Sequence, residues 1–364
     1  MKYSTAGESH GQGILALVED FPAGLTIDFD LINAELRRRQ GGYGRGGRQK
    51  IETDTAEILT GIWRGQSTGA PITLWIKNQD CRIDTAPDIT CPRPGHADLA
   101  GAVKYGLPIR PVLERASARE TAGRVAAGAL AKHLLRRQNI TVIGFVKSIG
   151  TFTLPADDRH FTPEELLQRR NESEFYTVFP EQDCELKKYV DGIAKDGDTV
   201  GGVVEVRAFY VPIGLGSHVQ WTDKLDGKLA RAVMSVQSVK GVEIGLGFES
   251  ARTLGSAMHD PIGYDAGLEH APCRGFVRQT NNAGGIEGGM TNGAAVVLRA
   301  AVKPIPTLLK PLDSIDLMTK KPMPAVYERS DVCAVPAASV VIENAAAWEI
   351  ADGLQNETAC GGKI

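Results

Sequence analysis

No stretch of this 364-residue sequence approaches the roughly 20 consecutive apolar residues that a membrane-spanning helix needs, and no signal peptide precedes its first motif. Cysteine is sparse as well: the six cysteines are scattered, and no two of them form a C-x-x-C pair. This spacing argues against a zinc site and against a disulfide framework. We therefore expect a cytoplasmic protein that binds no metal and contacts no membrane.

Net charge is also small, at −3, so global charge predicts no nucleic-acid partner. The cations are nevertheless unevenly distributed along the chain. Guanidinium groups gathered in a glycine-rich loop predict a binding site for anions. Positions 37–50 contain six cations and no acidic residue: Arg37, Arg38, Arg39, Arg45, Arg48 and Lys50.

Hydrophobic patterning predicts an α+β fold in which strands adjoin through glycine-rich connections that suit antiparallel pairing. No low-complexity linker marks a boundary, so residues 1–364 are predicted to form one domain. The stretch 92–111 holds four prolines and is predicted to be mostly irregular. Strands are predicted at 14–20, 72–77, 141–149, 203–211, 242–248 and 294–302, and helices at 28–39, 114–137, 163–170, 185–195, 223–236 and 339–354.

The first motif, Gly-Glu-Ser-His-Gly at 7–11, places a hydroxyl, an imidazole and a carboxylate side by side between glycines. Ser9 and His10 can each reach a small ligand from such a loop, although a simple tight turn has the same pattern. The motif also matches the G-x-S-x-G nucleophile elbow of α/β-hydrolases, which needs an oxyanion loop earlier in the chain. Only six residues precede it here, so a serine hydrolase is the less favoured alternative.

The arginine-rich loop contains a second formal match, Gly42-x-Gly44-x-x-Gly47, to the dinucleotide fingerprint. That fingerprint requires a strand before it and a helix after it, whereas a helix is predicted before it here. The loop also resembles one copy of an arginine-glycine box. An anion-binding or RNA-binding protein without enzymatic activity therefore stays open as an alternative.

Three further segments carry polar groups in rigid or glycine-rich surroundings. The turn 93–98 places His96 beside Arg93 and Asp98, a pattern that is more often structural than catalytic when it stands alone. The start of the predicted 114–137 helix offers Ser117 and Arg119 to a phosphate, although ordinary helix capping has the same pattern. The segment 281–293 is too rich in glycine for a helix or strand and lacks the ending of a P-loop, so ATP is not indicated. Such a loop can lie flat against a planar ligand.

Taken together, the motifs resemble the chorismate synthase family from about residue 3 to residue 344. They occur in order: Gly-Glu-Ser-His-Gly, Arg-Arg-Gln-x-Gly-Tyr-Gly-Arg-Gly, Arg-Pro-Gly-His-Ala-Asp, Ala-Ser-Ala-Arg-Glu-Thr, Val-Lys-Gly-Val-Glu-Ile-Gly, Asn-Asn-Ala-Gly-Gly-Ile-Glu-Gly-Gly, Lys-Pro-Ile-Pro-Thr and Arg-Ser-Asp. The resemblance implies a β-α-β sandwich, with long central helices between antiparallel sheets, assembled as a homotetramer. It implies a carbon–oxygen lyase that converts 5-enolpyruvylshikimate 3-phosphate to chorismate and phosphate by anti-1,4-elimination, the last step of the shikimate pathway. Reduced FMN is the implied cofactor, kept reduced either by NADPH or by a separate flavin reductase.

The resemblance also implies roles for individual residues. His10 would keep a proton near reduced FMN, His96 would act near the leaving phosphate, and Asp331 would set the protonation of the flavin N5, which removes the substrate proton. Ser9 and Ser117 would orient these groups. The implied cofactor contacts are Arg39, Arg45, Arg115, Ala116, Ser117, Gln237, Ser238, Gly288, Lys303, Pro304, Ile305, Pro306, Thr307 and Arg329, and the implied substrate contacts are Arg39, Arg45, Arg48 and Arg119.

Overall fold

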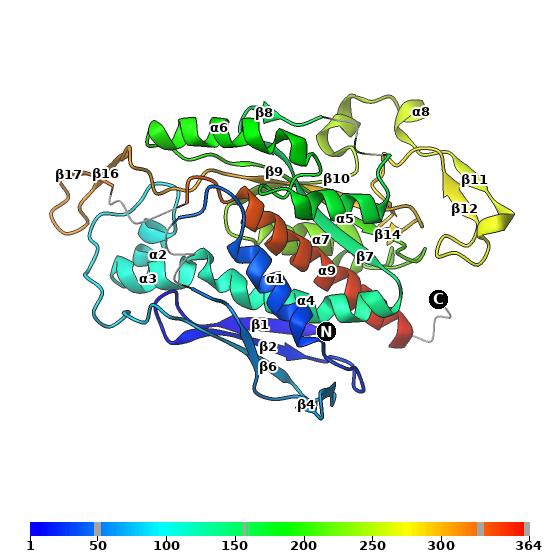
Figure 1. The fold of residues 1–364 in the computed structure, drawn as a ribbon, viewed down its shortest axis with the longest axis horizontal. Helices are drawn as coiled ribbons and strands as arrows, with labels where there is room; N and C mark the ends of the chain where they lie inside the picture. Colours follow the sequence, from blue (N-terminus) through cyan, green and yellow to red (C-terminus); the bar gives the residue numbers. More distant parts are fainter. Residues whose placement is uncertain (47–51, 156–157, 159, 326–330, 360–364) are drawn as a thin grey trace.

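Two antiparallel sheets enclose a layer of helices in the computed structural model (Figure 1). The structure describes residues 1–46, 52–155, 158, 160–325 and 331–359. One sheet has the order β1-β2-β6-β3, and the other has the order β10-β15-β9-β7-β8. The bounds are β1 Lys2–Ala6, β2 Gly13–Glu19, β3 Ala56–Ile58, β6 Ile72–Lys77, β7 Thr141–Ile149, β8 Phe152–Thr153, β9 Gly202–Phe209, β10 Val239–Ile244 and β15 Val296–Val302.

The helix layer is built from α1 (Phe29–Gln40), α4 (Thr121–Arg137) and α9 (Val335–Ala359). Helix α4 packs on β2 and β6 of the first sheet, and α9 packs on β7 and β9 of the second. Both helices are buried nearly all round, as expected of helices that lack a polar face. They cross closely because Gly128 has no side chain: a Cβ there would lie 2.6 Å from the carbonyl oxygen of Asn344. One continuous core thus joins the two sheets through the helices.

The remaining elements surround this sandwich. Helix α7 packs against α9 and β10, and α6 lies beyond the five-stranded sheet at the top of Figure 1. No helix in the described part of the chain combines the length and apolar character needed to cross a bilayer. The helix bounds are α2 Asp98–Tyr105, α3 Ile109–Ala116, α5 Pro163–Glu172, α6 Asp183–Lys195, α7 Leu225–Met234 and α8 Gly255–Met258. The short strands form four antiparallel pairs: β4 (Ile62–Trp63) with β5 (Gln66–Ser67), β11 (Ile262–Tyr264) with β12 (Phe276–Arg278), β13 (Ile286–Glu287) with β14 (Met290–Thr291), and β16 (Asp313–Ile315) with β17 (Pro322–Pro324).

The structure corrects four of the predicted elements. The stretch 92–111 is irregular at 92–97 and 106–108, but the rest of it belongs to α2 and to the start of α3, where Pro111 lies in the first turn and needs no intrahelical N–H partner. The predicted 114–137 helix is interrupted because Ser117 is extended (ψ 144°) and caps a 3₁₀ turn before α4 begins. The predicted strand 242–248 begins and ends earlier, since Gly245 and Gly247 have positive φ. Helix α9 begins four residues before the predicted 339 and continues past 354.

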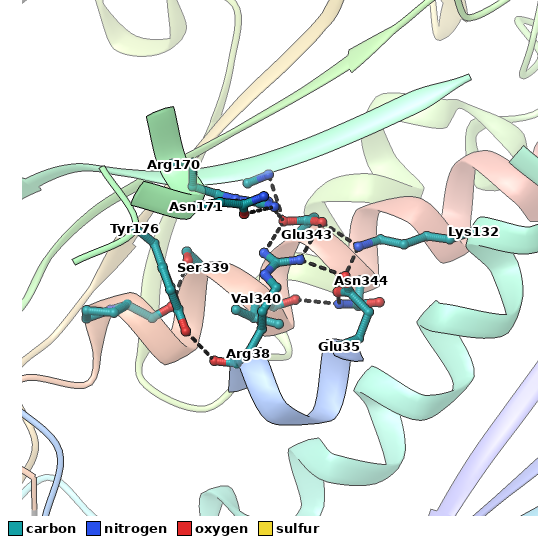
Figure 2. A network of polar contacts seen from close by, with 12 residues as sticks. Glu35, Arg38, Lys132, Arg170, Asn171, Tyr176, Ser339, Val340, Glu343 and Asn344 are labelled. Atoms are coloured by element: carbon teal, nitrogen blue, oxygen red, sulfur yellow. Dashed lines mark hydrogen bonds and ion pairs between the residues drawn. The ribbon is translucent and has the colours of Figure 1, made fainter. Parts of the chain in front are cut away.

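A buried ionic cluster fastens the C-terminal end of α1 to the neighbouring helices (Figure 2). The carboxylate of Glu343 on α9 accepts hydrogen bonds from both terminal nitrogens of Arg38, at 3.2 and 2.7 Å, and from Arg170 of α5 at 2.9 Å. Lys132 of α4 bridges Glu343 and Glu35, and the Glu35 carboxylate lies 2.7 Å from Arg38. Because Arg38 is held in this cluster, the next residue, Arg39, points away from it.

Candidate active site

A cavity of about 360 Å³ opens where the end of α1, the α3–α4 junction and the turn 93–97 meet. This volume lies within the range of roughly 300–1,000 Å³ that is usual for small-molecule sites. Segments far apart in the sequence line it. Of the predicted site residues, the lining includes Arg39, Arg45, His96, Ala116, Ser117, Arg119, Gln237, Ser238, Lys303, Ile305, Pro306, Thr307 and Asp331.

Two arginines of the cavity share one carboxylate. Asp54 accepts hydrogen bonds from Arg39 at 2.5 Å and from Arg119 at 2.6 Å. Burial alone would raise the pKa of Asp54, but the two guanidinium groups outweigh it and hold that pKa below its usual value. The ionised Asp54 therefore fixes both guanidinium groups at the wall, a geometry in which N–H groups that do not contact Asp54 can donate to an anion.

Several polar atoms at this wall lack a partner within the protein. The buried Nε atoms of Arg39 and Arg45 and the buried Oε1 of Gln237 make no hydrogen bond among the described residues. Buried polar groups without a partner are rare, and they are expected where a ligand or ordered water completes the site. Among the described residues of this wall, these three buried atoms are therefore candidates for contact with a ligand.

His96 is held by a second buried carboxylate, that of Asp98 at the start of α2. Nδ1 of His96 contacts Asp98 Oδ1, so a proton on Nδ1 is favoured and Nε2 is left for exchange with a ligand. Arg93 donates to Asp98 from its backbone N–H at 3.0 Å and from Nε at 2.9 Å. Burial alone would raise the pKa of Asp98, but the hydrogen bonds from His96 and Arg93 hold it well below its usual range.

Asp331 and Arg45 form a third charged pair at the cavity. Arg45 donates to Asp331 at 2.5 Å, and the backbone N–H of Gly46 donates to its other oxygen at 2.6 Å. Asp331 is therefore a fixed carboxylate beside a guanidinium group, and it lines the cavity.

His10 and Ser9 do not line the cavity. Both are buried, and the loop 7–11 contacts α3 through Glu114. The Glu114 carboxylate lies 2.9 Å from Nδ1 of His10 and accepts a hydrogen bond from the backbone N–H of His10 at 2.8 Å. Nε2 of His10 lies 3.7 Å from Asp80. Burial alone would raise the pKa of Glu114, but its hydrogen bonds with His10 outweigh that effect and lower it. His10 is thus placed between two carboxylates.

The loop geometry also decides between enzyme classes. Ser9 follows β1 and precedes β2, its partner in an antiparallel pair, whereas a nucleophile elbow connects a strand to a helix. The Ser9 side chain is also buried rather than presented at a sheet edge. The serine-hydrolase alternative is therefore wrong.

Other predicted contacts are placed differently. The Arg115 side chain turns away from the cavity and donates to the carbonyl oxygens of Thr5 and Gly7 at 2.8 and 3.0 Å. Gly288 occupies the turn between β13 and β14 and does not line the cavity, and neither does Pro304. Arg48 and Arg329 lie outside the described residues.

Sequence reasoning did not assign a role to several residues that hold the site together: Asp54, Asn78, Asp80 and Glu114. Asn78 accepts a hydrogen bond from Nε of Arg119 at 2.8 Å. No motif contains Asp54 or Asn78, and Arg119, the partner that they share, lies 65 and 41 residues away from them. Glu114 directly precedes the polar segment 115–120, and this position is its signal in the sequence, since its partner His10 lies 104 residues away.

Nearly the whole chain is similar to known proteins of one family. A family model described as chorismate synthase matches residues 1–354. The chorismate synthase of Geobacter metallireducens is 51% identical over 96% of this chain and 92% of its own, and that of Aquifex aeolicus is 50% identical over 97% and 92%. A solved structure described as a crystal structure of chorismate synthase superposes with a TM-score of 0.80 at 43% identity, covering 100% of this chain and 93% of that one. The predicted β-α-β sandwich is confirmed by that match, and the chain belongs to the chorismate synthase family of carbon–oxygen lyases, which act in the shikimate pathway to the aromatic amino acids and use reduced FMN.

Proposed function

We propose that the cavity between α1, the α3–α4 junction and the turn 93–97 is where this chain converts 5-enolpyruvylshikimate 3-phosphate to chorismate and phosphate. The observation that carries this assignment is the convergence of an Asp54-bridged arginine pair and a carboxylate-oriented His96 on one cavity. The substrate has two carboxylates and a phosphate, and this wall supplies matching cations.

The residues present also fit the cofactor. Reduced FMN brings a phosphate, ribityl hydroxyls and a flat ring with both donors and acceptors. The unpartnered Nε atoms of Arg39 and Arg45, Oε1 of Gln237 and the ammonium group of Lys303 offer complementary groups at one cavity. When bound, reduced FMN supplies an electron-rich ring that stabilises charge as the C–O and C–H bonds break, with no net oxidation.

The chain's own residues bind the anions and handle the protons. Arg39 and Arg119 hold the leaving phosphate and stabilise the charge that it gains as the C–O bond breaks. His96 holds a proton at Nε2 for that phosphate, and Asp98 fixes the ring by its contact with Nδ1. Asp331 serves the other proton transfer of the reaction, in which the substrate loses a proton as its C–H bond breaks.

His10 acts from outside the cavity lining. Glu114 and Asp80 flank its ring: Nδ1 lies 2.9 Å from the Glu114 carboxylate and Nε2 lies 3.7 Å from that of Asp80. His10 thereby keeps a proton in reserve near the cofactor. Ser9 and Ser117 orient their neighbours: the Ser117 hydroxyl accepts from the backbone N–H of Arg119 at 3.3 Å.

Assembly and electron supply complete the proposal. Large apolar side chains are strongly exposed between residues 219 and 262, among them Trp221 at 80% and Leu254 at 79%, and they support association of one-domain subunits into a cytoplasmic homotetramer. NADPH or a separate flavin reductase keeps FMN reduced. Light scattering tests the tetramer, and phosphate release with NADPH as sole reductant distinguishes the two electron sources.

The deciding experiment is an anaerobic assay of phosphate release with dithionite-reduced FMN. We expect activity in the wild type, and a loss of at least about 100-fold in His96→Ala and His10→Ala, the usual effect of removing a proton-transfer group. FMN binding, followed by absorbance, should persist in both. His218→Ala is the matched control, because that histidine is exposed and outside every motif. Wild-type-like turnover in His96→Ala would refute the proposed role of the cavity.

A further inference from the structure

Asn78, immediately after β6, has a side chain that is buried and fully hydrogen-bonded. Its Nδ2 donates to the carbonyl oxygens of Glu8, Ser9 and Gly11, at 3.1, 3.2 and 2.8 Å. Its Oδ1 accepts from Nε of Arg119 at 2.8 Å. One amide therefore contacts both the loop that carries His10 and the arginine pair of the cavity.

The His10 loop is also held by the segments beside it: the backbone N–H groups of Ser9 and His10 donate to the carbonyl oxygen and the carboxylate of Glu114, at 2.9 and 2.8 Å, and the N–H of Ile83 donates to the carbonyl oxygen of His10 at 3.1 Å. Within the loop itself, the described residues show one backbone hydrogen bond, from Gly11 to Glu8 at 3.3 Å. On the other side, Arg119 is fixed between Asp54 and Asn78. The relative placement of His10 and Arg119 thus depends on Asn78 more than on any contact between the two residues themselves.

We propose that Asn78 is a positioning residue, which holds the His10 loop in register with the anion-binding arginines so that proton supply and phosphate binding occur at a fixed separation. This inference rests on the proposed function, because it takes His10 as a proton-transfer group and Arg119 as an anion ligand. Displacing such groups by about 1 Å typically costs on the order of 100-fold in rate.

An amide is the side chain that this position requires. It presents two N–H donors at one end and an acceptor at the other, in a fixed geometry. An aspartate has the same shape and still accepts from Arg119, but it sets a carboxylate oxygen against three carbonyl oxygens. Asn78→Asp therefore separates the two halves of the contact: it keeps the arginine side and loses the loop side.

The test compares Asn78→Asp and Asn78→Ala with the wild-type enzyme under anaerobic conditions. For Asn78→Asp we expect kcat to fall by about 10- to 100-fold, with KM for the substrate changed by less than about threefold because Arg119 keeps its acceptor. Asn78→Ala should lower kcat and also raise KM. An Asn78→Asp enzyme with wild-type kcat would overturn the proposal.

A double-mutant cycle with His10→Ala separates positioning from general structural damage. If Asn78 acts through His10, adding Asn78→Asp to His10→Ala should lower kcat by less than about threefold more, because the group to be positioned is already gone. Losses that multiply in the double variant would refute the role of Asn78 alone. Full activity of His10→Ala would refute the proposed role of His10 itself, so the two failures are distinguishable.

A second pair of variants keeps the proposal testable if Asn78→Asp does not fold, as judged by thermal unfolding and FMN binding. Arg39 and Arg119 both donate to Asp54, but only Arg119 donates to Asn78. Both Arg39→Lys and Arg119→Lys should raise KM, whereas only Arg119→Lys should change the pH–rate profile that depends on His10. Identical pH–rate profiles for the two variants would overturn the proposal.

Discussion

Glu343 is the most completely buried carboxylate of the cluster that fastens α1, and it permits a quantitative prediction. Its side chain is 2% exposed and accepts from Arg38, Arg170 and Lys132, as well as from the backbone N–H of Gly144 at 2.9 Å. Burial alone would raise the pKa of Glu343, but the three cations hold it well below its usual value. The carboxylate is therefore charged throughout the neutral range.

Glu343→Gln removes that charge without changing the shape of the side chain. Three buried cations then remain with Glu35 as their one carboxylate in the cluster of Figure 2, and one end of the new amide presents N–H groups to other donors. Removing one partner of a buried ion pair typically costs about 3–5 kcal/mol. Since proteins are stable by only about 5–15 kcal/mol, the loss should be a large part of the total.

Urea unfolding measures this cost from the midpoint and the m value. The matched control is Glu185→Gln, since Glu185 forms a pair with Lys188 at 2.7 Å, the distance of the shorter Arg38–Glu343 contact, but on the exposed face of α6. Exposed pairs contribute little, so the control should leave the midpoint nearly unchanged. If Glu343→Gln shifted the midpoint no more than Glu185→Gln, the argument from burial would be refuted.

The pH dependence provides an independent check on the same residue. The folded pKa of Glu343 lies below its unfolded value of about 4.5, so its contribution is complete above pH 4.5 and is lost as the pH falls through the folded value. The stability difference between wild type and Glu343→Gln should therefore narrow in acid. A difference that stays constant down to the acid unfolding limit would contradict the assignment of the charge to Glu343.

Three further predictions concern other positions. Buried His133 accepts a hydrogen bond from the backbone N–H of Asp28, the N-cap residue of α1, and burial lowers the pKa of this histidine. Its contribution to the free energy of unfolding should therefore be complete above pH 6.5 and fall as the pH drops toward the folded pKa. Urea unfolding of His133→Gln should lack this trend. Gly7→Ala should lower the free energy of unfolding by more than about 2 kcal/mol, because φ is +104° and the new Cβ would lie 2.1 Å from the carbonyl oxygen of Gly13. The matched control is Gly24→Ala, at φ +79° with open space around it, which should cost only about 1–2 kcal/mol. Asp98→Asn should lower kcat by about 10- to 100-fold, with FMN affinity unchanged, because His96 loses the carboxylate that orients it; equal kcat values would contradict that role.

Much of the fold could be predicted because it is encoded locally. Strands β6 and β7 have the predicted bounds, since their apolar runs end at clear turn signals. The Thr162/Glu165 capping box is present with both hydrogen bonds, which fixes the start of α5. The break at Ser117 could not be predicted, because the residues on either side of it suit a helix and the interruption serves contacts made elsewhere in the molecule.

The sequence predicted most of the cationic side chains that line the cavity, but it did not predict the residues that hold those side chains in place. Arginines and histidines in glycine-rich motifs indicate an anion site wherever the motifs meet, and most of them do line one cavity. The direction of a side chain is a different matter: Arg115 belongs to a motif but turns outward to the β1 backbone. Asp54 and Asn78 have no motif because their function depends on partners brought close only by the fold.

Arg38 and Arg39 show how the buried cluster and the cavity are connected. Successive residues of a helix point about 100° apart, so one turn of α1 directs Arg38 into the Glu343 cluster and Arg39 toward Asp54 and the cavity. The backbone between them is held from a third direction by the hydroxyl of Tyr176, which donates to the carbonyl oxygen of Arg38 at 3.0 Å. Loosening the cluster should therefore shift Arg39, which lines the cavity, as well as weaken the core. Weak substrate binding should accompany loss of stability in Glu343 variants, even though Glu343 itself does not line the cavity.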